Sequence, residues 1–174
     1  MDFDSRRKEA WEFFFRGYSV YDYLDFTIGT WDPRGEGLSA FPGNSFYDGT
    51  VMRLYLKHLK DFFMSLDFVA MSPDPLLVQK IPDVVKAFAL SEKGTAYALY
   101  LAGSGLKRFT VDLPEGNYRV EWFNPLTGST RILPERVRGG TNVVLDIPSY
   151  LTDIALKLER TPDEESAEQP ALTC

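Results

Sequence analysis

Cysteine and histidine are almost absent from this sequence. Its 174 residues include one cysteine, Cys174, and one histidine, His58. These counts exclude an internal disulfide, a cysteine-based zinc site and a site built from several histidines. Gly103-Ser104-Gly105 is glycine-rich like a phosphate-binding loop, but a strand pattern follows it where such a loop needs a helix. We therefore expect no metal and no cofactor.

An excess of positive charge and long apolar runs are lacking as well. Lys and Arg number 19 against 25 Asp and Glu, which gives a net charge of −6 at pH 7. No basic patch stands out that could neutralise phosphates, and no apolar run approaches the roughly 20 residues of a membrane span. We expect neither nucleic acid nor a membrane as a partner. The composition, 44% hydrophobic and 25% charged, is ordinary for a globular protein with a buried core.

Aromatic residues are abundant, at 14%, and gather in the first third of the chain. The pattern there predicts a helix that begins at Asp4 or Ser5, either of which can cap it, and continues to about Arg16. Gly17 is suited to the left-handed residue that ends many helices. Apolar side chains cover more of this helix than a single stripe, which indicates that it packs on two sides.

The next segments do not form a domain by themselves. Residues 18–28 predict an aromatic-rich strand, and residues 29–49 predict a long glycine-rich loop. A second helix is predicted from about residue 50 to 66, because apolar residues recur at steps of three and four, and a short helical turn is predicted at 72–80. One strand cannot make a sheet. We therefore expect residues 1–81 to be the closing part of a (β/α)8 barrel whose earlier units lie outside this chain.

From Val84 onward the apolar residues alternate with a period of two, which is typical of strands. Tyr118 to Phe123 show this alternation, and Asn124-Pro125-Leu126-Thr127-Gly128 follows as a turn. Strands are predicted near residues 84–90, 95–102, 106–112, 117–124, 129–137, 141–147 and 152–159. Among the predicted turns between them are Pro114-Glu115-Gly116 and Gly139-Gly140.

Short strands at this spacing predict an antiparallel β-sandwich of about seven strands over residues 82–160. Residues 161–174 are acidic and predict a disordered tail. The expected fold class is therefore α+β: a helix–strand–helix remnant of a barrel followed by a β-sandwich.

Two stretches carry a resemblance to a known family. Arg-Arg-Lys-Glu-Ala-Trp-Glu-Phe-Phe-Phe-Arg-Gly at residues 6–17, with Leu-Lys-Asp-Phe-Phe at 59–63, resembles the closing barrel segment of apiosidase-like glycoside hydrolases. Tyr-Ala-Leu-Tyr-Leu at 97–101, with Asn-Tyr-Arg-Val-Glu-Trp-Phe-Asn-Pro-Leu-Thr-Gly at 117–128, resembles the C-terminal β-sandwich of those enzymes. That module is often labelled a collagen-binding domain.

The resemblance implies hydrolysis of glycosidic bonds, which requires two carboxylic acids on opposite sides of the scissile bond. In this family the pair lies on barrel strands earlier in the chain, so no catalytic residue is assigned here. The activity is expected only in a full-length protein, with a carbohydrate substrate.

Five residues on or near the predicted barrel strand and its loop are candidates for substrate binding. Tyr21, Tyr23 and Trp31 could form an aromatic platform for a sugar ring, or they could be ordinary packing residues. Asp22 and Asp25 could contact a sugar hydroxyl, or they could cap a turn or pair with an arginine.

Other conspicuous polar and aromatic residues have structural interpretations. His58 is expected to be solvated on the polar flank of the second helix. Trp122 is expected in the core because it alternates with other apolar residues, and Glu115, Arg119 and Glu121 are expected on a solvated strand face.

Two further functions stay open: a sandwich that binds polysaccharide or collagen, and a sandwich that only stabilises the barrel. The sandwich is expected to pack on the barrel part through Phe62, Phe63 and Phe68. Much apolar surface of the first 70 residues is expected to lack a partner. Poor order or self-association of the isolated chain would follow from this exposed surface.

Overall fold

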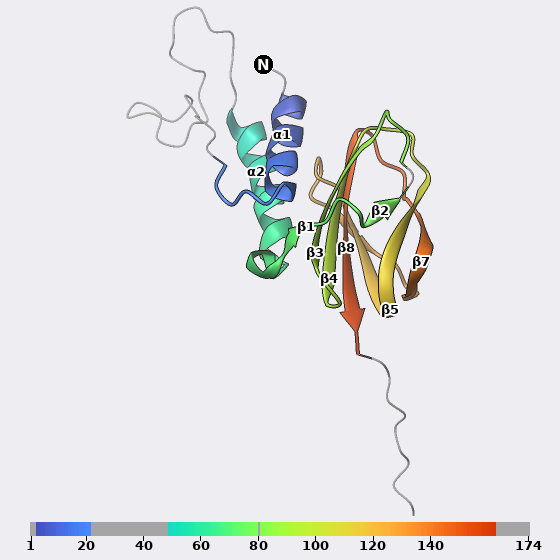
Figure 1. Cartoon of the computed structure of the whole chain (residues 1–174). Coiled ribbons are helices and arrows are strands. Elements are labelled where there is room, and N and C mark those ends of the chain that lie inside the picture. Colours follow the sequence, from blue (N-terminus) through green and yellow to red (C-terminus); the bar gives the residue numbers. More distant parts are fainter. Residues whose placement is uncertain (1–2, 22–48, 80, 163–174) are drawn as a thin grey trace, which may run out of the picture.

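The computed structural model describes residues 3–21, 49–79 and 81–162 (Figure 1). Within these ranges two α-helices precede a region of antiparallel strands, which confirms the α+β class. The helices are α1 (Phe3–Phe15), α2 (Gly49–Met64) and the short 3-10 helix η1 (Phe68–Ala70). The strands are β1 (Ser72–Pro73), β2 (Val78–Gln79), β3 (Lys86–Glu92), β4 (Ala96–Ala102), β5 (Arg108–Phe123), β6 (Thr130–Ile132), β7 (Val137–Asp146) and β8 (Asp153–Thr161).

The strands pair in the order β1-β3-β4-β8-β5-β2, and β6 and β7 also pair with β5. Strand β5 is the longest and joins the two layers of the sandwich. Its residues 117–123 pair with β8, whereas its residues 108–113 pair with β7, which also reaches Asn117 and Tyr118. The rings of Phe109 and Trp122 lie 6.3 Å apart, although 13 residues of straight strand would span about 40 Å. Strand β5 therefore bends over and covers its own other half.

Two turns predicted from sequence are wrong, and both lie at this bend. Residues 114–116 belong to β5 and residues 139–140 belong to β7, where Leu113 pairs with Gly140 and the register shifts on either side. A Cβ atom on Gly139 would lie 1.9 Å from the carbonyl oxygen of Pro114. Glycine and proline here mark a close approach of two bulged strands, a bend at which a strand changes layers.

Strand β4 is buried on both faces, and this explains its unbroken apolar sequence. Tyr97, Leu99 and Leu101 point into the sandwich. Ala98 and Tyr100 point the other way, into a second apolar cluster that the helices cover. In Figure 1 both helices lie next to the part of the sheet formed by β3, β4 and β8, and α1 contacts β3 and β4. The molecule thus has three layers: helices, one sheet layer, and the opposing part of the sandwich.

The helix predictions are confirmed, and the helical turn predicted at residues 72–80 is wrong. Helix α1 ends just before Gly17, whose φ of 86° is the predicted left-handed stop. Residues 18–21 of the predicted barrel strand are not in a strand, and residues 22–28 of it lie outside the described residues. Residues 72–79 form β1, a turn and β2, not a helical turn. Their two prolines lack N–H groups for a helix, and Asp74 N–H donates to the carbonyl of Ala89 at 2.9 Å.

Candidate functional site

The interface between the helices and the sheet centres on the side chain of Trp11, which is fully buried. Its ring lies 5.3 Å from that of Tyr100 on β4, 5.0 Å from Phe62 on α2 and 5.7 Å from Phe123 on β5. Ring separations of 4.5–7 Å are those of favourable aromatic pairs. One residue of α1 therefore contacts the second helix and two strands of the sheet.

The predicted packing residues Phe62, Phe63 and Phe68 all lie in this helix–sheet cluster, with Phe68 partly buried. On this face of the helices the apolar surface of the first 70 residues therefore has a packing partner. Strand β4, which is buried on both faces, supplies much of that partner surface.

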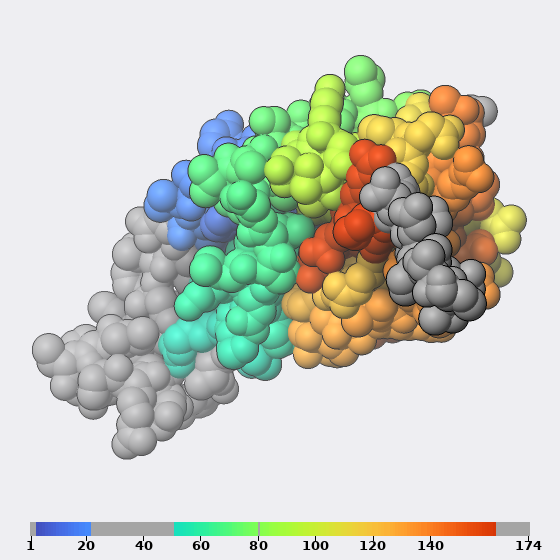
Figure 2. All heavy atoms as spheres, turned by 90° about the horizontal axis from the view of Figure 1, so that it is seen from below, coloured from blue at the N-terminus to red at the C-terminus, as the bar shows by residue number. Residues whose placement is uncertain are grey.

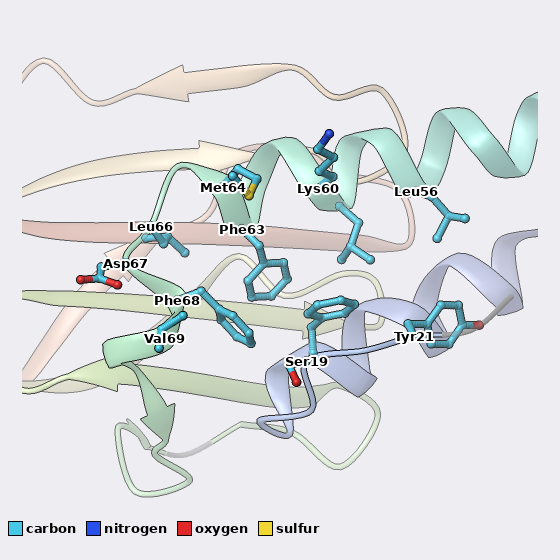
Figure 3. A pocket seen from close by; sticks show the side chains of 12 residues that line it. Ser19, Tyr21, Leu56, Lys60, Phe63, Met64, Leu66, Asp67, Phe68 and Val69 are labelled. Atoms are coloured by element: carbon cyan, nitrogen blue, oxygen red, sulfur yellow. The ribbon is translucent and has the colours of Figure 1, made fainter.

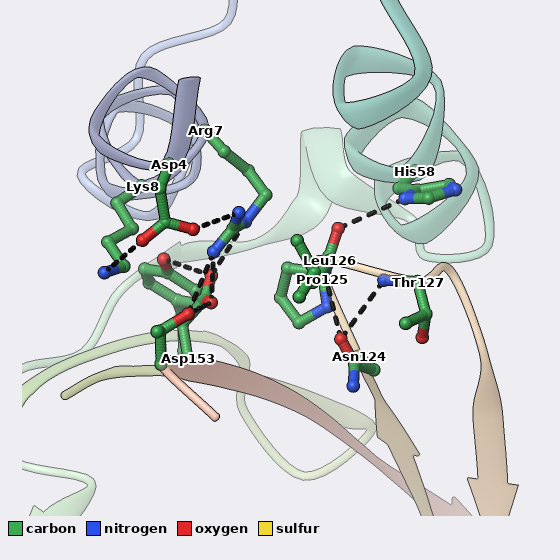
Figure 4. A network of polar contacts seen from close by, with 11 residues as sticks. Asp4, Arg7, Lys8, His58, Asn124, Pro125, Leu126, Thr127 and Asp153 are labelled. Carbon is green, nitrogen blue, oxygen red and sulfur yellow. Dashed lines mark hydrogen bonds and ion pairs between the residues drawn. The ribbon is translucent and has the colours of Figure 1, made fainter. Parts of the chain in front are cut away.

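A buried ion pair lies beside Trp11, as Figure 4 shows. Arg7 on α1 is 1% exposed, and its guanidinium Nη2 lies 2.5 Å from Asp153 Oδ1 at the start of β8. Arg7 Nη2 also donates to the hydroxyl of Thr152 at 3.1 Å, and Tyr100 donates its hydroxyl to Asp153 Oδ2 at 2.9 Å. On the outer side, Arg7 Nη1 pairs with Asp4 Oδ1 at 2.5 Å. We call these five residues the Arg7 network.

Burial and charge shift the pKa values in this network. Burial alone would lower the pKa of Arg7, but hydrogen bonding to Asp153 and its charge outweigh that effect and raise it. Burial would raise the pKa of Asp4, yet hydrogen bonds from Lys8 and Arg7 lower it overall. Burial raises the pKa of Tyr100 strongly, and the charge of Asp153 raises it further. Tyr100 thus stays a protonated donor, and the network acts as a fixed structural clamp, not as an acid–base pair.

Sequence reasoning missed Arg7 and Asp153, although a signal was present. Arg7, Trp11 and Phe15 follow one another at steps of four, so they share one face of α1, and all three are buried. A cation on the buried face of a helix requires a buried partner. That partner could not be found from sequence because it lies 146 residues away.

A second contact joins α2 to the Asn124–Gly128 turn, and it corrects the prediction for His58. This side chain is 7% exposed, and its Nδ1 lies 3.1 Å from the carbonyl oxygen of Pro125 (Figure 4). Asn124 Oδ1 stabilises the turn by accepting from the N–H groups of Leu126 and Thr127. The prediction was wrong because the Asn124–Gly128 turn, which is distant in sequence, covers this flank of the helix.

Gly128 is expected to be intolerant of substitution because His58 lies directly above it. A Cβ atom there would lie 2.6 Å from two atoms of the imidazole ring, and the backbone φ is 72°. We expect Gly128→Ala to lower the free energy of unfolding by about 2–3 kcal/mol in urea denaturation. Gly105→Ala is the matched control, since its φ is 83° with nothing within 4 Å, and it should lose only about 1 kcal/mol. Equal losses in the two variants would contradict the contact.

Lys157 on β8 forms a third contact, with Ser65 just after the end of α2. It is 7% exposed, and its Nζ lies 2.9 Å from Ser65 Oγ and 2.8 Å from Glu121 Oε1. The Glu121 side chain is only 14% exposed, which corrects its predicted solvated position.

Glu115 is solvated as predicted, and Arg119 is half-exposed and pairs with Glu159 at 3.2 Å. Trp122 lies in the core as predicted.

The opposite face of the helices carries an apolar groove of about 580 Å³, shown in Figure 3. We call it the helix groove. It is lined by Phe14, Ser19, Tyr21, Leu56, Leu59, Lys60, Phe63, Met64, Leu66, Asp67, Phe68 and Val69.

Of the five predicted substrate-binding residues, Tyr21 lines this groove and its ring lies 5.5 Å from that of Phe13. Asp22, Tyr23, Asp25 and Trp31 lie outside the described residues. The predicted grouping of these five residues therefore stays a prediction.

The described residues provide no cluster of three or more potential metal ligands. None of the helices described is long and apolar enough to cross a membrane. On the sandwich, the exposed large apolar side chains that the structure describes are aliphatic, such as Val84, Val144 and Leu151, and its aromatic side chains are buried or half-buried.

Comparison with solved structures relates this fold to glycoside hydrolases. The chain is similar to a protein described as a glycoside hydrolase, with a TM-score of 0.63 and 19% identity over 93% of this chain and 37% of that one. It is also similar to a glycoside hydrolase family 5 protein from Bacteroides vulgatus, with a TM-score of 0.53 and 14% identity over 66% of this chain and 25% of that one. The chain thus spans between 25% and 37% of the length of these proteins. No family model and no curated protein matches it.

Proposed function

We propose that this chain is the closing part of a (β/α)8-barrel glycoside hydrolase, residues 1–81, joined to its C-terminal β-sandwich, residues 82–160. The single observation that supports this most is the extent of the fold similarity. It runs over 93% of this chain, helices and sandwich together, and covers only 37% of the glycoside hydrolase. In the proposal, glycosidic bonds are hydrolysed only by a longer polypeptide that includes this chain.

The local chemistry supports a role in scaffolding more than in catalysis. Glycosidic cleavage needs two carboxylic acids that face one substrate. The buried acid Asp153 pairs with Arg7, and the nearly buried Glu121 pairs with Lys157. Asp153 thereby holds α1 on the sheet, whereas Glu121 pairs with its cross-strand neighbour, so each acid has a structural partner. We propose that the catalytic pair is supplied by barrel strands outside this chain, as in apiosidase-like enzymes.

Substrate contact by this chain is proposed for the segment that follows α1. Tyr21, Tyr23 and Trp31 would stack on sugar rings, and Asp22 and Asp25 would accept hydrogen bonds from sugar hydroxyls. The support is their residue types and their place in the sequence directly after the first helix, where a (β/α)8 barrel would have a strand and a loop facing the substrate.

The test compares the 174-residue chain with the same chain extended by any coding sequence continuous with its N-terminus. Each is assayed against a panel of aryl glycosides. We expect turnover by the extended polypeptide and none by the 174-residue chain. Turnover by the shorter chain would contradict the proposal, and so would upstream sequence without strand–helix repeats.

Variants of the extended polypeptide test the proposed contacts. Trp31→Ala and Asp25→Asn should each reduce kcat/KM by at least about tenfold, mainly through KM. Glu115→Gln is the control, because its side chain is 78% exposed on the sandwich. If the control and the two variants behave alike, these residues do not bind substrate.

A purely stabilising role for the sandwich is the second candidate, and the Arg7 network favours it over ligand binding. A polysaccharide-binding face needs accessible aromatic side chains, whereas Trp122 and Tyr118 are buried. Deletion of residues 82–160 from the extended polypeptide would then lower its melting temperature and leave the specific activity of the surviving enzyme unchanged. Retention of the sandwich by insoluble polysaccharide or collagen would favour the binding module instead.

A further inference from the structure

A polar pocket of about 480 Å³ lies on the β-rich part of the molecule, and none of its lining residues belongs to a helix. Its volume is within the roughly 300–1,000 Å³ of small-molecule sites. Figure 2 views the molecule from the end at which the turn between β3 and β4 and the bend of β5 reach the surface. Residues from three segments line the pocket, among them Asp74, Leu76, Gln79, Lys93, Asp112 and Pro114.

Each of the two aspartates in this pocket is fixed through one carboxylate oxygen. Asp74 Oδ2 accepts from the hydroxyl of Ser91 at 2.9 Å, and Asp112 Oδ1 accepts from the backbone N–H of Asn142 at 2.7 Å. Asn142 has a φ of 54°, a left-handed backbone that is uncommon for residues other than glycine. No described residue donates to the second oxygen of either carboxylate. Each acid therefore has one charged acceptor that is held in place and available to a ligand.

A cation shares the pocket with these acids but does not neutralise them. Lys93, in the turn between β3 and β4, forms no ion pair or side-chain hydrogen bond with any residue in the described ranges. Gln79 donates its amide to the carbonyl of Leu76 at 2.7 Å, which leaves its amide oxygen as a further acceptor. Lys93 would repel a ligand that is only a cation, and the aspartates would repel one that is only an anion. A neutral molecule with several hydroxyl groups suits both, because a hydroxyl donates and accepts.

The accessible apolar part of the pocket wall is aliphatic. Leu76 is 78% exposed and Pro114 is exposed, whereas Tyr97, which also lines the pocket, is 1% exposed. The pocket therefore lacks the aromatic platform on which a polysaccharide chain lies across a flat face. It suits a single sugar residue, whose C–H face contacts Leu76 and Pro114 while its hydroxyl groups meet the polar side chains.

We propose that this pocket, which we call the sandwich pocket, binds the terminal sugar residue of a glycan. Hydroxyl groups of the sugar donate to the available oxygens of Asp74 and Asp112, and Lys93 donates to a hydroxyl or ring oxygen. The ligand class rests on the proposed function, since a glycoside hydrolase acts on carbohydrate. The pocket is separate from the proposed substrate contacts after α1, and binding here holds a glycan and cleaves no bond.

An NMR titration of the 15N-labelled 174-residue chain tests the sandwich pocket. The probes are short oligosaccharides of glucose, xylose, mannose, galactose or arabinose, each added with a metal chelator present. We expect at least one to bind with a Kd of roughly 0.1–10 mM, because one sugar residue makes few contacts. The amide signals of Lys93 and Asn142 should shift, and raised salt concentration should change the Kd little because the ligand is neutral.

Aspartate-to-asparagine variants test the two acceptors. Asp74→Asn and Asp112→Asn keep the oxygen that accepts the fixed hydrogen bond and replace the available oxygen by an NH2 group, which cannot accept. Each should weaken sugar binding at least about tenfold, as expected for a lost hydrogen bond to a charged group. Asp146→Asn is the matched control, because Asp146 is also on the sandwich but is 76% exposed, pairs with Arg108 and does not line the pocket. Its Kd should be unchanged, and circular dichroism checks that each variant is folded.

Absence of binding by every probe at about 10 mM overturns the inference. Binding that survives both pocket variants also overturns it, because the sugar would then lie elsewhere, and so does an equal loss in Asp146→Asn. Binding that appears only when Ca²⁺ replaces the chelator would identify a cation site instead. Failure of sugar binding here leaves the hydrolysis test of the extended polypeptide standing, and failure of hydrolysis leaves the titration unchanged, so the two proposals fail separately.

Discussion

Replacement of Arg7 by methionine is expected to lower the free energy of unfolding by about 3–5 kcal/mol. The arginine is 1% exposed, and Asp153, its partner, is 2% exposed. Removal of the cation leaves a carboxylate enclosed by protein, and among the described side chains the hydroxyls of Tyr100 and Thr152 remain as its donors. An uncompensated buried charge is among the costliest defects in a protein core. Urea denaturation followed by far-ultraviolet circular dichroism measures the loss.

Arg6→Met is the matched control for this experiment. Arg6 is the preceding residue on the same helix, its side chain is 42% exposed, and its ion pair with Glu9 is exposed too. A surface pair of this kind contributes about 1 kcal/mol or less. If the two arginine variants lose the same stability, burial does not govern the Arg7 network.

The double variant Arg7→Met/Asp153→Asn separates the charge from the packing. Asparagine keeps an acceptor for Tyr100, and no buried charge remains. We expect the double variant to be more stable than Arg7→Met alone by about 1–2 kcal/mol, a coupling within the usual range for residues in contact. A double variant less stable than Arg7→Met would show that Asp153 has another role.

The period of the apolar residues was enough to predict both helices and most strands. Steps of three and four set α2, and Gly17 marked the end of α1. The strand predictions were wrong where glycine and proline residues were compatible with either a turn or a β-bulge. Pro114-Glu115-Gly116 has turn residues, but in the structure it is a bulge in β5 opposite Gly139 and Gly140. Only the partner strand distinguishes a turn from a bulge, and that strand is distant in sequence.

The contacts between helices and sheet could be predicted only in part. Large aromatic residues at helical spacing, such as Phe62, can be predicted to be buried from sequence alone. His58, Arg7 and Lys157 do not, because a polar side chain is buried only when a specific partner reaches it. The partner of His58 is in the Asn124–Gly128 turn, that of Arg7 is at the start of β8, and those of Lys157 are on β5 and just after α2. Tertiary packing brings these segments together.

Replacement of Trp11 by alanine is expected to cost about 3–5 kcal/mol and to release the helices from the sheet. This ring is in contact with Phe62, Tyr100 and Phe123, so its loss leaves a cavity bordered by three elements of structure. The sandwich has its own apolar cluster on the other side of β4 and should stay folded. Urea denaturation should therefore show two transitions where the parent chain shows one, the first of them with loss of helical circular dichroism.

Tyr18→Ala is the control for Trp11→Ala, because Tyr18 is also aromatic and follows the same helix but is 56% exposed. Its ring stacks only on that of Phe13 among the aromatic contacts that the structure describes, so the expected loss is about 1 kcal/mol or less, in a single transition. A single transition for Trp11→Ala, with strands and helices unfolding together, would show that the sandwich depends on the helices for its own stability. The helices and the sandwich would then form one cooperative unit, and the Arg7 network would act within a continuous core, not across a docking surface.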